Sequence, residues 1–202
     1  PDGALTPRVL ADARSKIVVP VSCTEHGRWN YLSAAFAASG NMMSPGIRKK
    51  KGSSVSAMLK ASGKFSSDQE EVWDEIAALH HKLGSSHKSA TGAMSDAYAE
   101  RGHELEKMAG AFAMQEGQTG LLVLRDGQVE GCDVVSRLAV YRHLHDRLVR
   151  SYAMDALAER PRPGARPAPD PLAEARGFLQ AVAAADTQPH KSPGLGEDLR
   201  LS

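Results

Sequence analysis

Residues 121–135, LLVLRDGQVEGCDVV, decide the fold class because they predict a β-hairpin. Asp126-Gly127 is a two-residue turn whose positive φ angles match the right-handed twist of paired strands. Apolar and β-branched residues on both sides of this turn supply the two strands. The chain is therefore expected to contain antiparallel β-structure in addition to helices.

Two other stretches have strand character. Residues Lys16–Cys23, KIVVPVSC, form a β-branched run. Pro20 has no N–H to donate, so this run is expected at a sheet edge or a bulge. Residues Gly194–Leu201, GLGEDLRL, look like the start of a strand for which the sequence offers no partner.

Helical spacing of apolar residues predicts the rest of the secondary structure. Ser67–Leu83 is the best-defined helix, because Ser67 and Glu70 form a capping box and Gly84 follows its end. The alanine-rich residues Ser33–Ser39 could form a short helix. Further helices are expected at Ile47–Ala61, Ser95–Phe112, Arg137–Glu159 and Pro171–Ala185.

These elements predict an α+β fold that is helix-rich overall. We expect a small, mostly antiparallel sheet of Lys16–Cys23 and Leu121–Val135, with three to four covering helices. Residues 1–159 would form this domain, residues 160–171 (RPRPGARPAPDP) a Pro-rich linker, and residues 172–202 a short helix and tail that pack back on the domain. Both ends of the sequence read as those of a piece of a longer protein.

Composition excludes several classes of protein. The 202 residues carry 25 Lys and Arg against 24 Asp and Glu, so general nucleic-acid binding is not expected. No apolar run approaches the ~20 residues that span a bilayer, which excludes an integral membrane protein. Two cysteines, Cys23 and Cys132, are too few for a disulfide scaffold. Without a signal segment we expect a cytoplasmic location and reduced thiols, and an oligomer remains open.

Residues Val21–Tyr31, VSCTEHGRWNY, gather unusual side chains after the predicted strand. On a strand, Cys23 and Glu25 would share a face and could form a metal-binding pair or an acid/base pair. Arg28 offers a fork suited to phosphate, and Trp29 and Tyr31 offer stacking faces. The alternative interpretation is an Arg–Glu salt bridge beside a buried Trp and Cys.

Further candidates lie on two predicted helices. Gln69 and Trp73 are four residues apart and share a face, either as ligand contacts or as a core Trp with Gln at its edge. Ser151, Tyr152 and Asp155 lie late on the long helix. An inward-facing Asp155 would indicate a site, whereas an outward-facing one would carry no meaning.

The sequence has one basic cluster and lacks the common phosphate- and metal-binding motifs. Residues 48–51, RKKK, form either a solvated helix face or a phosphate-contacting patch. The sequence contains no G-x-G-x-x-G, G-x-x-x-x-G-K-[ST], H-E-x-x-H or C-x-x-C motif. We therefore predict no metal site and no resident cofactor, and leave open a small phosphate-containing ligand.

Several of these segments, in this order, resemble a known family. VPVSCTEHGRWNY, SDQEEVW, GLLVLRDGQVEGCD, RSYAMDAL and GLGEDLRL are similar to the ARG-and-rhodanese-phosphatase-superfamily-associated protein domain, from about Lys16 to the end. The family's name implies a link to ADP-ribosylglycohydrolases and rhodanese-type phosphatases, and hence to NAD or ADP-ribose metabolism or a bacterial conflict system. The resemblance implies functional positions at Cys23, Glu25, Gly27, Arg28, Trp29, Gln69, Trp73, Ser151, Tyr152 and Asp155.

Together these features lead to two principal hypotheses for an uncharacterised bacterial-type domain. In the first, it is an enzyme on a nucleotide or ADP-ribose-related substrate, with Glu25 as general acid/base and Cys23 and Asp155 as further catalytic residues. Its ligand contacts would be Arg28, Trp29, Tyr31, Gln69, Trp73, Ser151 and Tyr152. In the second, it is a non-catalytic module that binds such ligands or a protein. A purely structural piece, with its polar cluster buried and salt-bridged, is a third interpretation.

Overall fold

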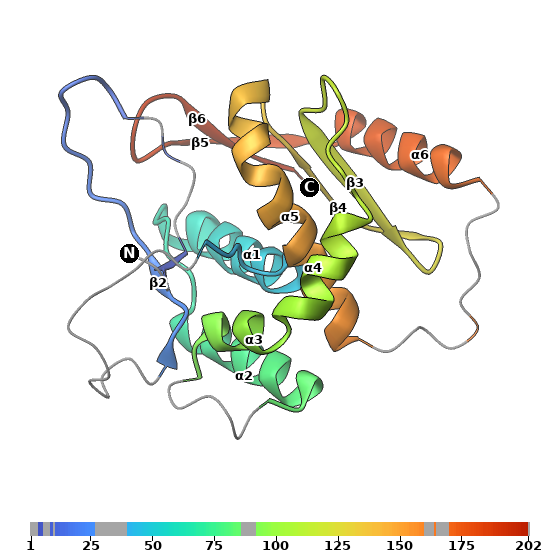
Figure 1. The fold of residues 1–202 in the computed structure, drawn as a ribbon. Helices are drawn as coiled ribbons and strands as arrows, with labels where there is room; N and C mark the ends of the chain where they lie inside the picture. The colour runs from blue at the N-terminus through green and yellow to red at the C-terminus, as the bar shows by residue number, and fades with distance from the viewer. Residues whose placement is uncertain are drawn as a thin grey trace.

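The computed structural model describes residues 4–5, 9, 11–26, 40–85, 92–159, 164 and 170–201. These residues form an α+β, helix-rich fold, as the sequence predicts (Figure 1). The helices are α1 (Pro45–Ser62), α2 (Gln69–Leu83), α3 (Met94–Glu100), α4 (Gly102–Gly110), α5 (Leu138–Ala158) and α6 (Pro171–Ala184). The strands are β1 (Ala4–Leu5), β2 (Ser22–Cys23), β3 (Gly120–Arg125), β4 (Gln128–Val134), β5 (Thr187–Lys191) and β6 (Glu197–Leu201).

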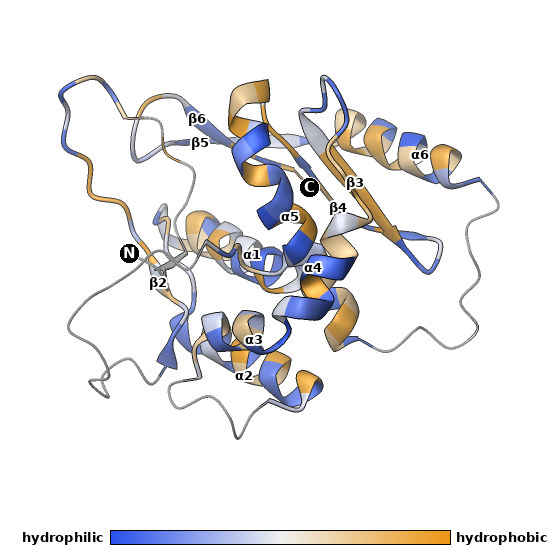
Figure 2. Ribbon diagram, in the orientation of Figure 1, coloured by the Kyte–Doolittle hydropathy of each residue, from blue (hydrophilic) through white to orange (hydrophobic). Residues whose placement is uncertain are grey.

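The predicted hairpin is confirmed as β3 and β4. Asp126 and Gly127 have φ angles of 53° and 77°, as a turn of this type requires. The strands pair antiparallel, with Leu122 opposite Cys132. Helix α5 lies on one side of the hairpin and α6 on the other (Figure 1). Strand β3 is apolar along most of its length, which suits a position between two helices (Figure 2).

The hydrophobic core is helical and does not include the hairpin. Helix α2 places an apolar stripe against α1, α3, α4 and α5, because its buried residues recur at helical spacing. Burial of these side chains is the main force that holds the helices together. The core residues are Met43, Ile47, Val72, Ile76, Leu79, Leu83, Met94, Ala97, Tyr98, Leu105, Ala153 and Met154.

The expected strand at Lys16–Cys23 is mostly wrong. Of this run only Ser22–Cys23 is a strand, and it pairs with β1, not with the hairpin. Pro20 interrupts the run, and Val18 and Val21 are 84% and 57% exposed, so most of this segment is not packed as a core strand. The described strands therefore form three separate two-stranded pairs, β1–β2, β3–β4 and β5–β6, and not the single sheet that the sequence suggested.

Two helix boundaries differ from the sequence-based expectation. The N-cap of α2 is Asp68, which accepts hydrogen bonds from the N–H groups of Glu70 and Glu71, so the capping box at Ser67 does not form. The helix expected at Ser95–Phe112 is divided into α3 and α4 at Arg101. Gly102, which has low helix propensity, follows this break, and the Arg101 side chain donates to the carbonyl of Leu83.

The C-terminal segment corrects another expectation. Strand β6, within GLGEDLRL, has a partner, because β5 pairs with it from Thr187–Leu201 to Lys191–Glu197. The short helix suggested at Ser33–Ser39 lies outside the described residues, as does most of the Pro-rich segment. Among the described helices, none has both the length and the apolar character to cross a bilayer.

Candidate functional site

A cleft of about 710 Å³ lies between β3 and α5, and the end of α4 closes one side of it. We call it the apolar cleft, because most of its wall is hydrocarbon. Every residue of β3 contributes to the wall, together with the exposed Phe112 beyond α4 and Val149 of α5. Its size is that of a pocket for a small organic ligand. The titratable residues in its wall are Arg125, Glu130, His145, Tyr152 and Asp155.

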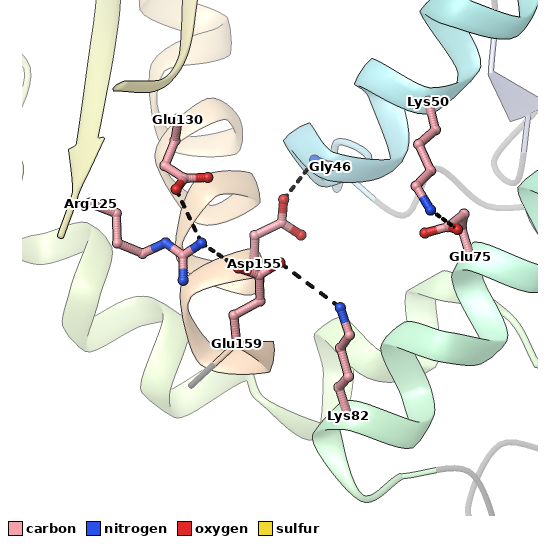
Figure 3. Close-up of polar contacts among 8 residues, drawn as sticks. All are labelled: Gly46, Lys50, Glu75, Lys82, Arg125, Glu130, Asp155 and Glu159. Atoms are coloured by element: carbon pink, nitrogen blue, oxygen red, sulfur yellow. Dashed lines mark hydrogen bonds and ion pairs between the residues drawn. The ribbon is translucent and has the colours of Figure 1, made fainter. Parts of the chain in front are cut away.

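Asp155 is the predicted catalytic residue that the structure places at this cleft. Its Oδ2 accepts a hydrogen bond of 2.7 Å from the N–H of Gly46, in the first turn of α1. A Cβ on Gly46 would lie 3.1 Å from this oxygen, so glycine permits the close approach. Figure 3 shows this contact between two segments distant in the sequence.

The surroundings of Asp155 disfavour its charged form. Burial raises the pKa of the Asp155 carboxyl above its ordinary value, although the hydroxyl of Ser44 and the N–H of Gly46 oppose the change. Ser44 is fully buried, and its Oγ makes no hydrogen bond of normal geometry to any described residue, so the bond to Asp155 comes from Gly46. A carboxyl with a raised pKa beside a cleft can both give and take a proton.

Charged residues surround the end of the cleft nearest Asp155. Arg125 of β3 forms ion pairs with Glu130, at 3.1 Å, and with Glu159 (Figure 3). Lys82 of α2 lies 3.9 Å from the second oxygen of Glu159. The two acidic groups, Glu130 and Glu159, balance the two basic groups, Arg125 and Lys82, so the ion pairs at this end carry no net charge. The Lys50–Glu75 pair in Figure 3 joins α1 to α2 away from this end.

A chain of hydrogen bonds through His145 forms another part of the wall. Nε2 of His145 lies 2.8 Å from the carbonyl oxygen of Phe112, which can only accept, so this nitrogen carries the proton. Nδ1 of His145 then accepts from the Tyr141 hydroxyl at 3.0 Å. Gln118 in turn donates to the Tyr141 oxygen at 2.8 Å. In its neutral form, His145 therefore carries its proton on Nε2.

Behind the cleft, Asp133 holds a network of Arg48 and Tyr152. Arg48 of α1 donates to both carboxylate oxygens of Asp133, at 2.7 and 2.9 Å. The Tyr152 hydroxyl donates to Oδ2 of Asp133 at 2.9 Å. Burial and the Asp133 charge raise the pKa of Tyr152, so its hydroxyl stays protonated. The network joins α1, β4 and α5 and determines the shape of the cleft wall.

Cys23, predicted as catalytic, lies in β2 and is anchored by Gln69. The side chain of Gln69 accepts from the Cys23 N–H at 2.7 Å and donates to the Cys23 carbonyl at 2.8 Å. The Cys23 thiol contacts the carbonyl oxygen of Glu25 at 3.3 Å. Of the described residues predicted as catalytic, Asp155 lines the apolar cleft, whereas Cys23 and Glu25 do not. The three residues are therefore not brought together there.

The remaining predicted ligand contacts have diverse surroundings. Trp73 packs edge-on against His26, with ring centroids 4.6 Å apart, and its Nε1 is buried without a partner among the described residues. The Ser151 hydroxyl is fully buried and donates to the Leu148 carbonyl within α5. Arg28, Trp29 and Tyr31 lie outside the described residues. Their predicted roles, like that of Glu25, stay predictions.

Sequence reasoning missed Asp133 as an organising residue. Nothing in the local pattern of the hairpin distinguishes it, since its partners lie 85 and 19 positions away, in α1 and α5. One weak signal exists. Gly131, two residues before it, leaves space for Tyr152, because a Cβ there would lie 2.6 Å from the Tyr152 hydroxyl oxygen.

Across the described residues, fold and site define a helix-rich α+β domain with a ligand-sized apolar cleft and a largely buried carboxyl, Asp155, in its wall. The chain belongs to the ARG and Rhodanese-Phosphatase-superfamily-associated Protein domain family, whose model matches residues 2–202. This family is uncharacterised, and its name associates it with the rhodanese-phosphatase superfamily. Neither a curated protein nor a solved structure matches the chain. Among the described residues, no group of three His, Cys, Asp or Glu side chains is arranged to hold a metal ion.

Proposed function

We propose that the protein is an enzyme that acts on a nucleotide or ADP-ribose-related substrate in the apolar cleft, with Asp155 as its acid–base group. The observation that carries this proposal is the position of Asp155 in the cleft wall, with burial raising the pKa of its carboxyl. In a hydrolysis, the ionised carboxylate would take a proton from the attacking water and return it to the leaving group. Water is the only co-reactant that such a step needs.

The walls of the cleft support a substrate with a flat apolar part. Leucine and valine side chains of β3 and the exposed ring of Phe112 offer surfaces on which a base could rest. The imidazole of His145 adds a polar group to this wall. The cleft volume of about 710 Å³ is within the range of pockets for small organic ligands.

The test uses an isosteric substitution, Asp155→Asn, which keeps an oxygen that can accept from Gly46. Calorimetry of the full chain with NAD, ADP-ribose and AMP should show saturable binding of at least one of them, and chromatography should show its conversion. In Asp155→Asn, binding should stay within about threefold, whereas turnover should fall by about 10²–10⁴-fold. The matched control is Asp74→Asn, which replaces an exposed aspartate of α2 and should leave both quantities unchanged.

Two results would contradict this proposal. If none of the three nucleotides gives heat or product, the substrate class is wrong. If turnover is equal in Asp155→Asn and in the parent protein, Asp155 is not the acid–base group.

A non-catalytic ligand-binding module is the second candidate function. It is favoured by the fact that other reactive groups near the cleft are engaged internally, with the Tyr152 hydroxyl on Asp133 and the Ser151 hydroxyl on Leu148. A single carboxyl can bind a ligand without transforming it. This function predicts heat on ligand addition with no product after prolonged incubation.

A further inference from the structure

A second cleft, of about 480 Å³, lies near the middle of α1 and is bordered by β2 and β6. We call it the basic cleft, because Arg48, Lys51 and Arg200 line it and Asp198 is the one acidic residue among its described lining residues. With Lys51 protonated, the lining residues carry an excess of two positive charges, and Asp133 behind Arg48 offsets one of them. The whole chain carries a formal net charge of +1, so the positive charge here is concentrated locally.

Arg48 presents a guanidinium that is already fixed in place. Its Nε donates to the Met43 carbonyl at 3.0 Å, and its two terminal nitrogens donate to Asp133 at 2.7 and 2.9 Å. These three bonds use three of the five N–H donors of the guanidinium. Because its orientation is set in advance, little side-chain entropy is lost when an anion binds.

Strand β6 turns its charged residues toward the cleft and its leucines away from it. Asp198 and Arg200 are half-buried, whereas Leu199 and Leu201 are 59% and 52% exposed. A register shift of one residue would turn the leucines inward, as the hydrophobic effect alone would favour. Arg200 pairs with Asp198, with an Nη2–Oδ2 distance of 3.1 Å, and this pair holds the guanidinium at the cleft.

Lys51 and two serines supply the other polar groups that the cleft offers. Lys51 follows Arg48 by three residues, so the two lie on one face of α1. Burial lowers the pKa of Lys51 to about 8, which is the change that a bound anion would reverse. The hydroxyls of Ser22 and Ser67, 2.5 Å apart, add hydrogen-bonding capacity.

We propose that the basic cleft binds a phosphoryl group, as free phosphate or as the phosphate of a small ester. Guanidinium donors and a lysine charge are the groups that recognise phosphate oxygens. The cleft lies apart from Asp155, so this site does not require catalysis in the apolar cleft and would also serve a purely binding protein. Its enclosed volume and the near-neutral chain suit a small ligand, not a polymer.

The probes are inorganic phosphate and pyrophosphate, titrated into the full chain by calorimetry at constant ionic strength. We expect one saturable site per chain. Lys51→Gln and Arg200→Gln should each weaken binding about tenfold, the effect of losing one charge-assisted contact. Lys60→Gln, at an exposed lysine of the same helix, should leave it unchanged. Circular dichroism checks that each variant is folded.

Several outcomes would overturn the proposal. The first is the absence of saturable heat with either probe. The second is an equal loss of affinity in Lys60→Gln, which would indicate general electrostatic attraction. The third is tighter binding of a short single-stranded oligonucleotide than of pyrophosphate. Asp155→Asn separates this site from the apolar cleft. If that variant binds phosphate normally but has lost turnover, both proposals hold, whereas normal phosphate binding with unchanged turnover contradicts the enzyme proposal alone.

Discussion

The network of Arg48, Asp133 and Tyr152 gives the sharpest test of how the fold supports the cleft. Asp133 is 7% exposed and accepts three hydrogen bonds from these two partners. Replacing it with alanine leaves the guanidinium of Arg48 without a counter-charge in a largely buried setting. We therefore predict that Asp133→Ala destabilises the protein strongly.

The size of the effect follows from the geometry. Removing one partner of a buried ion pair costs about 3–5 kcal/mol. The Arg48 side chain is 25% exposed, so water can solvate part of the unpaired guanidinium. We therefore expect a loss of about 3 kcal/mol in the free energy of unfolding, at the lower end of the range. Tyr152→Phe removes one hydrogen bond to a charged acceptor and should cost about 1.5 kcal/mol.

Urea unfolding followed by circular dichroism measures both values. Arg48→Met and the double variant with Asp133→Ala complete a cycle, whose interaction free energy should be about 2 kcal/mol. Asp146→Ala, at an exposed aspartate of α5, is the control and should change stability by less than about 0.5 kcal/mol. A loss below about 1 kcal/mol in Asp133→Ala, or no interaction energy in the cycle, would refute the reasoning.

Three further predictions concern single positions. Gln69→Ala removes both hydrogen bonds to the Cys23 backbone, so hydrogen exchange of the Cys23 amide should accelerate at least about tenfold. Protection of this amide equal to that in the parent protein would contradict the anchoring role of Gln69. Gly131→Ala places a Cβ 2.6 Å from the Tyr152 hydroxyl oxygen and should cost about 1–3 kcal/mol in urea unfolding. For Lys51, the folded pKa of about 8 means that the lysine is charged below this pH. The advantage of the parent over Lys51→Gln in pyrophosphate affinity should therefore be fully present below about pH 8 and decline progressively as the pH rises above it, because a bound anion raises the pKa of the lysine in the complex.

Local sequence signals predicted the β3–β4 hairpin and helix α2, because both are specified mainly by residues close together in the sequence. The Asp126-Gly127 turn needs positive φ angles, which the sequence makes evident, and the hairpin forms where expected. The apolar stripe of α2 likewise defines its buried face. The N-cap of α2 was predicted wrongly, because two neighbouring residues could each cap the helix. Asp68 caps α2 in preference to Ser67, whose hydroxyl instead contacts Ser22.

Long-range contacts account for what sequence reasoning could not supply. Strand β5 contains Pro189 and mostly polar residues, so nothing marked it as the partner of β6. Arg200 reaches the basic cleft only because that pairing exists. The contact of Asp155 with Gly46, 109 residues away, likewise could not be predicted from the sequence.

The most direct test of the proposed function compares Asp155→Asn with the parent protein on whichever of NAD, ADP-ribose and AMP binds most tightly. The account predicts a dissociation constant within about threefold of the parent and turnover reduced by at least about a hundredfold. Unchanged turnover in Asp155→Asn, or the absence of heat and product with all three nucleotides in the parent protein, would contradict it.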